Sequence, residues 1–192
     1  MGQRDEIVAV MQRVLDQWKR DLRVATPGQI RSYDPSAQTA DVQPQIRREL
    51  RRLSDERERV FDDMPIIPNV PVCFPRFGPW FVSFPIADGD YCLLLVCDQD
   101  LTRWREQGRT GDPYMPSSHH ISDAVAVPGL FPEAAALSDA HADHLVIGKD
   151  GGPTLHVTDD DVRVGGASAG KRVALVEDLE ELKQAIASAG IT

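Results

Sequence analysis

The sequence contains little that suits a membrane-spanning chain, a secreted scaffold or a zinc cluster built from thiols. Only three of the 192 residues are cysteines, and Cys73, Cys92 and Cys97 are an odd number at no metal-ligand spacing. Each lies among apolar neighbours, so we expect buried free thiols. No apolar run is long enough to span a bilayer. The first residues mix charged with apolar side chains, which argues against a secretory signal and predicts synthesis in a cytoplasm.

Positive charge is also scarce. The chain carries 21 Lys and Arg against 30 Asp and Glu, a net charge of −9. Nucleic-acid binders usually present a basic face, because phosphate contacts dominate their affinity. Here the basic residues gather in one run at 47–59, where acidic residues are interleaved. This pattern favours a solvated, salt-bridged face over a phosphate site.

Motifs that carry catalysis are missing as well. The serines Ser83, Ser117, Ser118 and Ser122 show no Gly-x-Ser-x-Gly context, and the glycine pairs 151–152 and 165–166 are typical of turns rather than of a phosphate-binding loop. The acidic pair 62–63 and the triplet 159–161 are typical of exposed loops, with weak calcium binding as the alternative reading of the triplet. We therefore predict that the chain is not an enzyme and has no catalytic, cofactor-binding or metal-binding residues.

Five histidines raise one further hypothesis, a metal site. His119 and His120 with Asp123, or His141 and His144 in the sequence HADH, offer imidazole ligands of the kind that zinc takes. Adjacent histidines on a strand point to opposite faces, so joint chelation by the first pair is awkward. The HADH pair lies in a linker and has no glutamate base beside it, as a hydrolase motif would have. Both pairs therefore favour structural or solvated histidines.

The order of the patterns predicts a mainly β chain between two helices. Residues 3–23 carry apolar side chains at spacings of three and four, which predicts an amphipathic helix that packs on the following domain or on another subunit. From Pro27 to about Leu130, short β-rich segments alternate with turn residues, which predicts a small, mostly antiparallel barrel. Tyr91–Cys97 is the most apolar run, and we expect this strand to lie deepest in the core. The other expected elements are strands at 29–33, 39–44, 70–75, 80–85 and 122–130 and a short helix at 101–107.

The last third of the chain predicts an oligomer. Around 145–166 three short β-rich pieces alternate with Gly and Asp turns, and units of this size are marginal in water by themselves. They are explained if identical segments of other chains complete the fold. A final helix with Leu175, Leu179, Leu182 and Ile186 at spacings of four and three would form a three-stranded interface or a docking element. In a trimer, the His156 side chains of three chains could lie together near the axis.

Three segments, in order and at consistent spacing, resemble a known family. They are PGQIRSYDPSAQTADVQP, VPVCFPRFGPWFVSFPIADGDYCLLLVCDQDLTRW and HHISDAVAVPGLFP. Over residues 27–133 they resemble the N-terminal domain of tailed-phage central-spike and baseplate proteins, including the family named for its Gp138 member. Residues 145–190 resemble the short β-helix and terminal segment of the same spikes.

The resemblance implies a mainly β fold: an OB-fold barrel followed by a short trimeric intertwined β-helix, with helices at both termini. It assigns residues 1–26 to an N-terminal amphipathic helix and 27–133 to an OB-fold collar domain. A linker at 134–144 then leads to the β-helix spike at 145–170 and a C-terminal helical segment at 171–192. Intertwined strands from three chains leave few free edges, which suits a part that bears axial load.

As function, the resemblance implies a structural virion protein, the central spike of a phage or phage-like tail baseplate. It would dock on the tail hub and puncture the host cell envelope during contraction. The implied partners are two further copies in a homotrimer, the baseplate hub protein and, during injection, the host outer membrane. Longer spikes carry a metal-binding His-x-His pair at the apex, which this chain lacks, and its β-helix is brief. Either a blunt spike or a separate tip protein is therefore expected. The protein would be made in the host cytoplasm and reside in the virion, without a cofactor and without binding nucleic acid.

Two other functions compete with this interpretation. An OB-fold nucleic-acid-binding module would need a basic groove with exposed aromatic side chains. The acidic balance opposes it, and Phe74, Phe81 and Phe84 lie in strand patterns that predict burial. A metal-dependent hydrolase of the host cell wall would use the histidines as ligands, and stoichiometric zinc with turnover of envelope polymers would support it.

Overall fold

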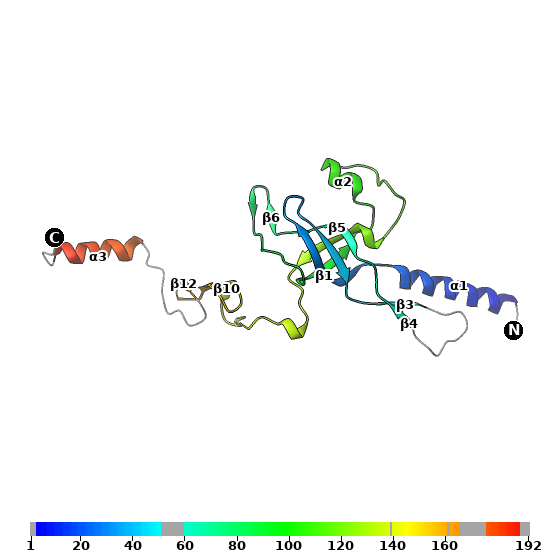
Figure 1. Ribbon diagram of the computed structural model, residues 1–192, viewed down its shortest axis with the longest axis horizontal. Helices are drawn as coiled ribbons and strands as arrows, with labels where there is room; N and C mark the ends of the chain where they lie inside the picture. Colours follow the sequence, from blue (N-terminus) through cyan, green and yellow to red (C-terminus); the bar gives the residue numbers. More distant parts are fainter. Residues whose placement is uncertain (1–2, 51–59, 139, 161, 166–175, 189–192) are drawn as a thin grey trace. The chain divides into compact units, whose positions relative to one another are not determined.

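The computed structural model of the protein describes residues 3–50, 60–138, 140–160, 162–165 and 176–188. The chain forms two compact units, Met1–Phe131 and Pro132–Thr192. The first unit contains a five-stranded sheet and helices α1 and α2, and the second contains a three-stranded sheet and helix α3 (Figure 1). The expectation of a mainly β chain with a helix towards each end is confirmed.

The sheet of the first unit is antiparallel throughout. Its strand order is β5-β2-β1-β8-β9. An isolated bridge joins Val72, just beyond β5, to Ala126 in β9, so the sheet curls into a half-barrel. The strands are β1 (Ala25–Asp34), β2 (Thr39–Pro44), β5 (Ile67–Pro71), β8 (Tyr91–Val96) and β9 (Ala124–Pro128).

The predicted hairpin at 29–44 is confirmed as β1 and β2. At its turn the carboxylate of Asp34 accepts hydrogen bonds from the Ser36 hydroxyl and from the backbone N–H groups of Ser36 and Ala37. These bonds hold the pKa of Asp34 below its ordinary value. The ladder shifts register between Ile30 and Ser32, as at a β-bulge, which adds local twist to the strand.

The core lies on one face of the half-barrel. In β8, Cys92, Leu94 and Val96 are buried, whereas Leu95 is 42% exposed. The strand expected deepest in the core therefore buries only alternate residues, because an antiparallel sheet can leave its second face to solvent. The buried apolar side chains are Ile30, Ala40, Val42, Ile67, Val70, Val72, Cys92, Leu94, Val96, Ala124 and Ala126.

Gly28 lets β1 approach the core closely. A Cβ atom at this position would lie 2.6 Å from Cγ1 of Val42 and 3.0 Å from Cγ of Leu94. Both of those side chains are fully buried. Glycine is therefore required here by space rather than by an unusual backbone conformation.

The aromatic segment after β5 differs from its prediction. The expected strands at 70–75 and 80–85 shrink to the end of β5 and to a small hairpin of β6 (Arg76–Phe77) and β7 (Trp80–Phe81). Prolines at 75, 79 and 85 supply no N–H donor, which limits strand pairing.

The burial predicted for this segment is partly wrong. Phe81 and Phe84 are 66% and 51% exposed, and only Phe74 packs partly against the core. Cys73 is also exposed, in contrast to the buried Cys92, because it lies beyond the end of β5. Burial raises the pKa of the Cys92 thiol to about 11.

Part of the Arg-rich run forms a second small hairpin. β3 (Arg48–Leu50) pairs with β4 (Val60–Asp62), and residues 51–59 lie outside the described residues. Arg47 forms an exposed ion pair with Asp63, with 2.7 Å between Nε and Oδ1. This contact agrees with a solvated, salt-bridged face.

The helices leave apolar stripes uncovered. In α1 (Gln3–Asp21), Ile7, Met11, Val14 and Trp18 are each more than half exposed, so this stripe does not pack on its own unit. In α3 (Val176–Ser188), Leu179, Leu182 and Ile186 are exposed, and Leu175 lies outside the described residues. The short helix α2 (Thr102–Gln107) confirms its prediction and ends at Gly108 in the left-handed region. None of the described helices combines the length and apolar character needed to cross a bilayer.

The second unit contains the three predicted short strands. They are β10 (Leu145–Gly148), β11 (Thr154–Val157) and β12 (Val162–Gly165), and they form an antiparallel sheet in the order β10-β11-β12. The strands therefore pair with one another within a single chain. The predicted intertwined β-helix would instead combine strands of three chains.

Candidate functional site

The sheet β10-β11-β12 has two chemically different faces. Its register aligns Leu145 with Val157 and Val162, and Ile147 with Leu155 and Val164. Because side chains alternate between faces, these six apolar residues share one face. The same alternation places Thr154 and His156 on the opposite face, where both are buried. One face is thus apolar and, in the single chain, largely exposed, and the other carries polar groups beneath the segment that precedes β10.

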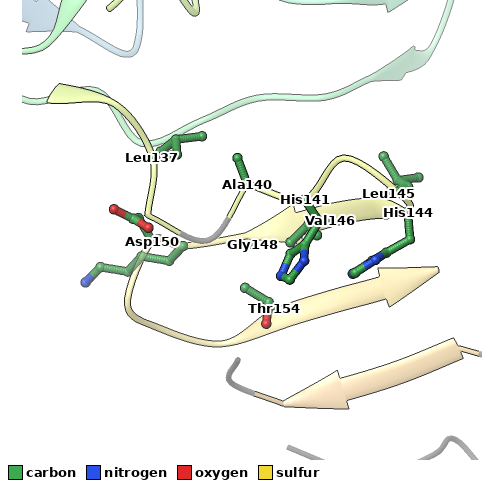
Figure 2. Close-up of a pocket in the computed structure, with 10 residues that line it drawn as sticks. Leu137, Ala140, His141, His144, Leu145, Val146, Gly148, Asp150 and Thr154 are labelled. Atoms are coloured by element: carbon green, nitrogen blue, oxygen red, sulfur yellow. The ribbon is translucent and has the colours of Figure 1, made fainter. Parts of the chain in front are cut away.

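Three histidines meet on the polar face. His141 and His144 belong to the segment before β10, and His156 belongs to β11. One nitrogen of each ring lies within 4.8 Å of one nitrogen of each other ring. The ring centroid of His144 lies 4.3 Å from the ring centroid of His141 and 5.1 Å from that of His156. Figure 2 shows the rings of His141 and His144 on the same side of the hairpin, directed towards the strand that carries Thr154.

Hydrogen bonds fix which nitrogens of two rings carry hydrogen. The Thr154 hydroxyl donates its only hydrogen to the carbonyl oxygen of Gly165 at 2.7 Å. It must therefore accept at its 2.9 Å contact with Nε2 of His156, which makes that nitrogen a donor. On the other side, Nδ1 of His144 lies 2.9 Å from the Asp143 carboxylate. This hydrogen bond holds the pKa of Asp143 below its ordinary value, so the ionised carboxylate accepts and Nδ1 of His144 donates.

The two remaining nitrogens face each other. Nε2 of His144 and Nδ1 of His156 are 2.8 Å apart. Since the outer nitrogen of each ring is already a donor, two neutral rings would direct lone pairs at each other here. A cation at this point removes that repulsion, either a proton shared by the two rings or a metal ion bound by both lone pairs. The chemistry of the cluster is therefore that of a cation site.

The cluster borders an open hollow. The hollow has a volume of about 290 Å³, and Leu137, His141, His144 and Thr154 are among its lining residues (Figure 2). The exposed fractions are 41% for the His141 side chain and 13% for the His144 side chain, while His156 is 8% exposed. The site thus has one accessible ligand and two nearly buried ones, with space on the open side for a small molecule such as water.

Two members of the other metal hypothesis, His120 and Asp123, have structural roles. His120 is the residue before a 3-10 turn (Ile121–Asp123), and its Nδ1 accepts a hydrogen bond from the backbone of Ser122. Asp123 is buried and accepts from the backbone N–H of Leu101. Across the part of the chain that the structure describes, the His141–His144–His156 group is the one set of three or more such residues with metal-ligand geometry.

Sequence reasoning considered all three histidines of the cluster but did not group them. For the HADH pair the sequence predicts structural or solvated histidines, and for His156 it offers a meeting of three copies near a trimer axis. The missed signal is the alternation of polar and apolar residues along β11, Thr154-Leu155-His156-Val157. This alternation puts the two polar side chains on one face. Only the fold shows that the HADH segment covers this face.

Residues 26–129, more than half of the 192 residues, match the model of the phage protein Gp138 N-terminal domain. The chain belongs to this family. It is thus a phage protein with a Gp138 N-terminal domain, and the family resemblance seen in the sequence is confirmed at that level. No curated protein matches the chain.

The Gp138 N-terminal domain coincides with the half-barrel. It begins within β1 and ends directly after β9, so it includes the exposed aromatic hairpin β6–β7 and α2. In that hairpin Phe77 and Trp80 are 87% and 80% exposed. The histidine cluster and the two-faced sheet lie beyond residue 129, outside the matched domain. Both lie in the second unit.

Proposed function

We propose that the protein is the central spike of a phage or phage-like tail baseplate. Three copies would form an OB-type collar that docks on the tail hub, and their C-terminal units would form a short spike that punctures the host envelope during contraction. The observation that carries the proposal is the Gp138 N-terminal domain followed by a small sheet with one exposed apolar face. Mechanical penetration requires no catalytic residue.

The apolar sheet face supports assembly with further copies of the same chain. Leu145, Ile147 and Val164 are each more than half exposed, and Val157 and Val162 are 36% and 42% exposed. Apolar groups this concentrated on a sheet of three four-residue strands are stabilised when they leave water. A three-fold axis along this face would bury the apolar residues of three chains against one another, which is the core that a single small sheet lacks.

The terminal helices support the same assembly. The stripe of α1 and the stripe of α3 each repeat at helical spacing and are exposed in the single chain. Amphipathic helices obtain most of their stability from packing of the apolar face. Contacts with the other subunits would cover both stripes.

The aromatic hairpin supports docking on a protein partner. Phe77, Trp80 and Phe81 lie within a few residues of one another and are each at least 66% exposed. Large aromatic side chains are enriched at the centres of protein interfaces and carry much of their binding energy. We assign this hairpin to the collar's contact with the baseplate hub. A separate tip protein at the far end of the short spike is a further partner under this proposal.

The first experiment is the solution mass of the full chain, by light scattering coupled to gel filtration. The expected result is three times the chain mass of 21.2 kDa. A folded monomer at micromolar concentration would contradict the spike. The second experiment is mass spectrometry and cryo-electron microscopy of purified tails. Three copies on the tail axis at the baseplate are expected, and their absence from the particle would remove the virion role.

The exposed aromatic hairpin also favours a second candidate, a nucleic-acid-binding OB module. Aromatic side chains such as Trp80 can stack on single-stranded bases, and Arg76 adds a positive charge in the same hairpin. The net charge of −9 opposes this function, because phosphate binding needs a basic groove. Salt-dependent retention of single-stranded DNA that is lost in Trp80→Ala would favour it. No retention at low salt would exclude it.

A further inference from the structure

We propose that His141, His144 and His156 of one chain bind a zinc ion, and that this metal fixes the segment before β10 to the sheet. The site goes beyond the proposed spike role, because it lies within a single chain and outside the matched family domain. It also differs from a site shared about a three-fold axis. His156 lies on the polar face of the sheet, opposite the apolar face that would line such an axis.

The distances suit a zinc ion after small side-chain movements. Zinc binds imidazole nitrogens at about 2.0–2.1 Å in tetrahedral geometry, which places neighbouring ligand nitrogens about 3.3–3.5 Å apart. The three candidate nitrogens already lie within 4.8 Å of one another. The His144–His156 pair, at 2.8 Å, must open slightly, and His141 must move inward. His141 is the most exposed of the three side chains and is therefore the one with room to move.

The outer hydrogen bonds are those of a prepared ligand set. Metal-binding histidines usually donate their second N–H to a carboxylate or another acceptor, which fixes the tautomer and the ring orientation. Here Asp143 accepts from His144, and Thr154 accepts from His156 and is itself held by the carbonyl of Gly165. Each bond leaves the lone pair of the other ring nitrogen directed at the centre of the cluster. Neither ring needs to change its outer hydrogen bond, to Asp143 or to Thr154, to bind a metal.

The donor set and the open side select the class of metal. Three neutral imidazoles suit zinc and its transition-metal neighbours, and do not suit calcium or magnesium, which take oxygen ligands. The hollow beside His141 provides space for water as a fourth ligand. Among these metals we choose zinc, because it undergoes no change of oxidation state.

The metal would act as a cross-link. Two ligands, His141 and His144, come from the segment before β10, and the third, His156, comes from β11. The same segment is already held through Ser138, whose hydroxyl and backbone N–H both donate to Asp150 at 2.6 and 3.1 Å. Because a metal that binds the folded arrangement stabilises it, zinc should raise the stability of this small unit.

The test uses the full chain, stripped of metal with a chelator and titrated with zinc by calorimetry, with metal content measured after desalting. We expect one zinc per chain. His156→Gln should weaken binding by more than about 100-fold, since it removes a ligand, and Asp143→Asn by about 10–100-fold, as for outer-shell partners. His120→Gln is the matched control, because it removes a histidine outside the cluster and should leave binding unchanged. Cobalt bound in place of zinc should give the visible absorption of a tetrahedral site, and His156→Gln should abolish it.

Several results would overturn the site. They are the absence of stoichiometric zinc, one zinc per three chains, equal binding by His156→Gln and the parent chain, or loss of binding in His120→Gln. Should circular dichroism show that His156→Gln is unfolded, His141→Gln, which changes an exposed side chain, replaces it. Zinc stoichiometry and solution mass are separate measurements, so failure of the metal site leaves the trimer to its own test.

Discussion

The change of Ile147 to aspartate tests the apolar face most directly. Ile147 lies in β10, opposite Leu155 and in line with Val164, so it forms one end of a row of three apolar side chains that crosses the sheet. It is 56% exposed in the single chain, and an aspartate there would be solvated in a monomer. The substitution therefore has little effect on the isolated unit, and its cost arises when copies of the chain associate.

The magnitude follows from burial. Complete burial of an isoleucine side chain contributes about 1.5–3 kcal/mol, so covering the exposed half of Ile147 contributes about 1 kcal/mol per chain. Aspartate loses this contribution and adds the desolvation of a polar group, about 2 kcal/mol or more. Over three chains the loss is roughly 9 kcal/mol, and since about 1.4 kcal/mol is tenfold in an equilibrium constant, trimer formation weakens by about a million-fold.

Sedimentation equilibrium over a range of micromolar concentrations measures this change. We expect a trimer for the parent chain and a folded monomer for Ile147→Asp, with unchanged far-ultraviolet circular dichroism. Leu137→Asp is the matched control, because Leu137 is equally exposed at 58% but lines the hollow on the side of the histidines. It should remain a trimer. A trimeric Ile147→Asp would refute the reasoning that this face holds the chains together.

Three further predictions concern the half-barrel. Leu94→Ala should lower the free energy of unfolding by about 2–5 kcal/mol in denaturant titrations, because Leu94 is fully buried. Leu95→Ala, at a position that is 42% exposed, should lower it by less than half as much. Equal losses would contradict the assigned core face. Gly28→Ala should lower the free energy of unfolding by about 1–3 kcal/mol in the same titrations, because the added methyl group overpacks against Val42 and Leu94 on the two neighbouring strands. A stabilised variant would show that these strands have room to shift. With a thiol reagent at pH 8, the exposed Cys73 should react rapidly and Cys92 only on unfolding. Burial of Cys92 blocks the reagent and raises the pKa of this thiol to about 11, so little thiolate is present. Equal reaction rates of the two cysteines by peptide mapping would contradict this.

The parts of the fold that sequence predicted well are those set by local chemistry. The β1–β2 hairpin follows from a turn in which Asp34 binds the next backbone N–H groups, and α2 ends where Gly108 permits a left-handed residue. The periodicity of α1 likewise predicted a helix, but not what covers its apolar stripe. Periodicity identifies a face and does not identify its partner.

Two of the failures concern exposure. Phe81 and Phe84 were expected to be buried because aromatic residues in a β-like pattern usually face a core. The neighbouring prolines keep the β6–β7 hairpin short, and the described residues of the first unit leave its aromatic side chains exposed. A single sequence does not contain that information, because exposure depends on how segments distant in the chain fold over one another.

The candidate site likewise has a part that the local sequence predicts and a part that only the fold shows. The alternation along β11 predicts that Thr154 and His156 share a face, and the spacing of His141 and His144 predicts that they are close. What brings the two pairs together is the return of the chain over the sheet, supported by the bonds between Ser138 and Asp150. The segment has no regular pattern of its own at this point, so its course was not predictable.

The odd number of strands in the small sheet has a mechanical consequence. In an antiparallel sheet of three consecutive strands, the chain enters β10 at one edge and one end, and leaves β12 at the other edge and the opposite end. Backbone hydrogen bonds in such a sheet run across the strands. A force applied between the entry and exit points therefore acts along the strands and loads both ladders in shear, so that many bonds resist together. A hairpin of two strands would place both points at one end, where the bonds would open one after another.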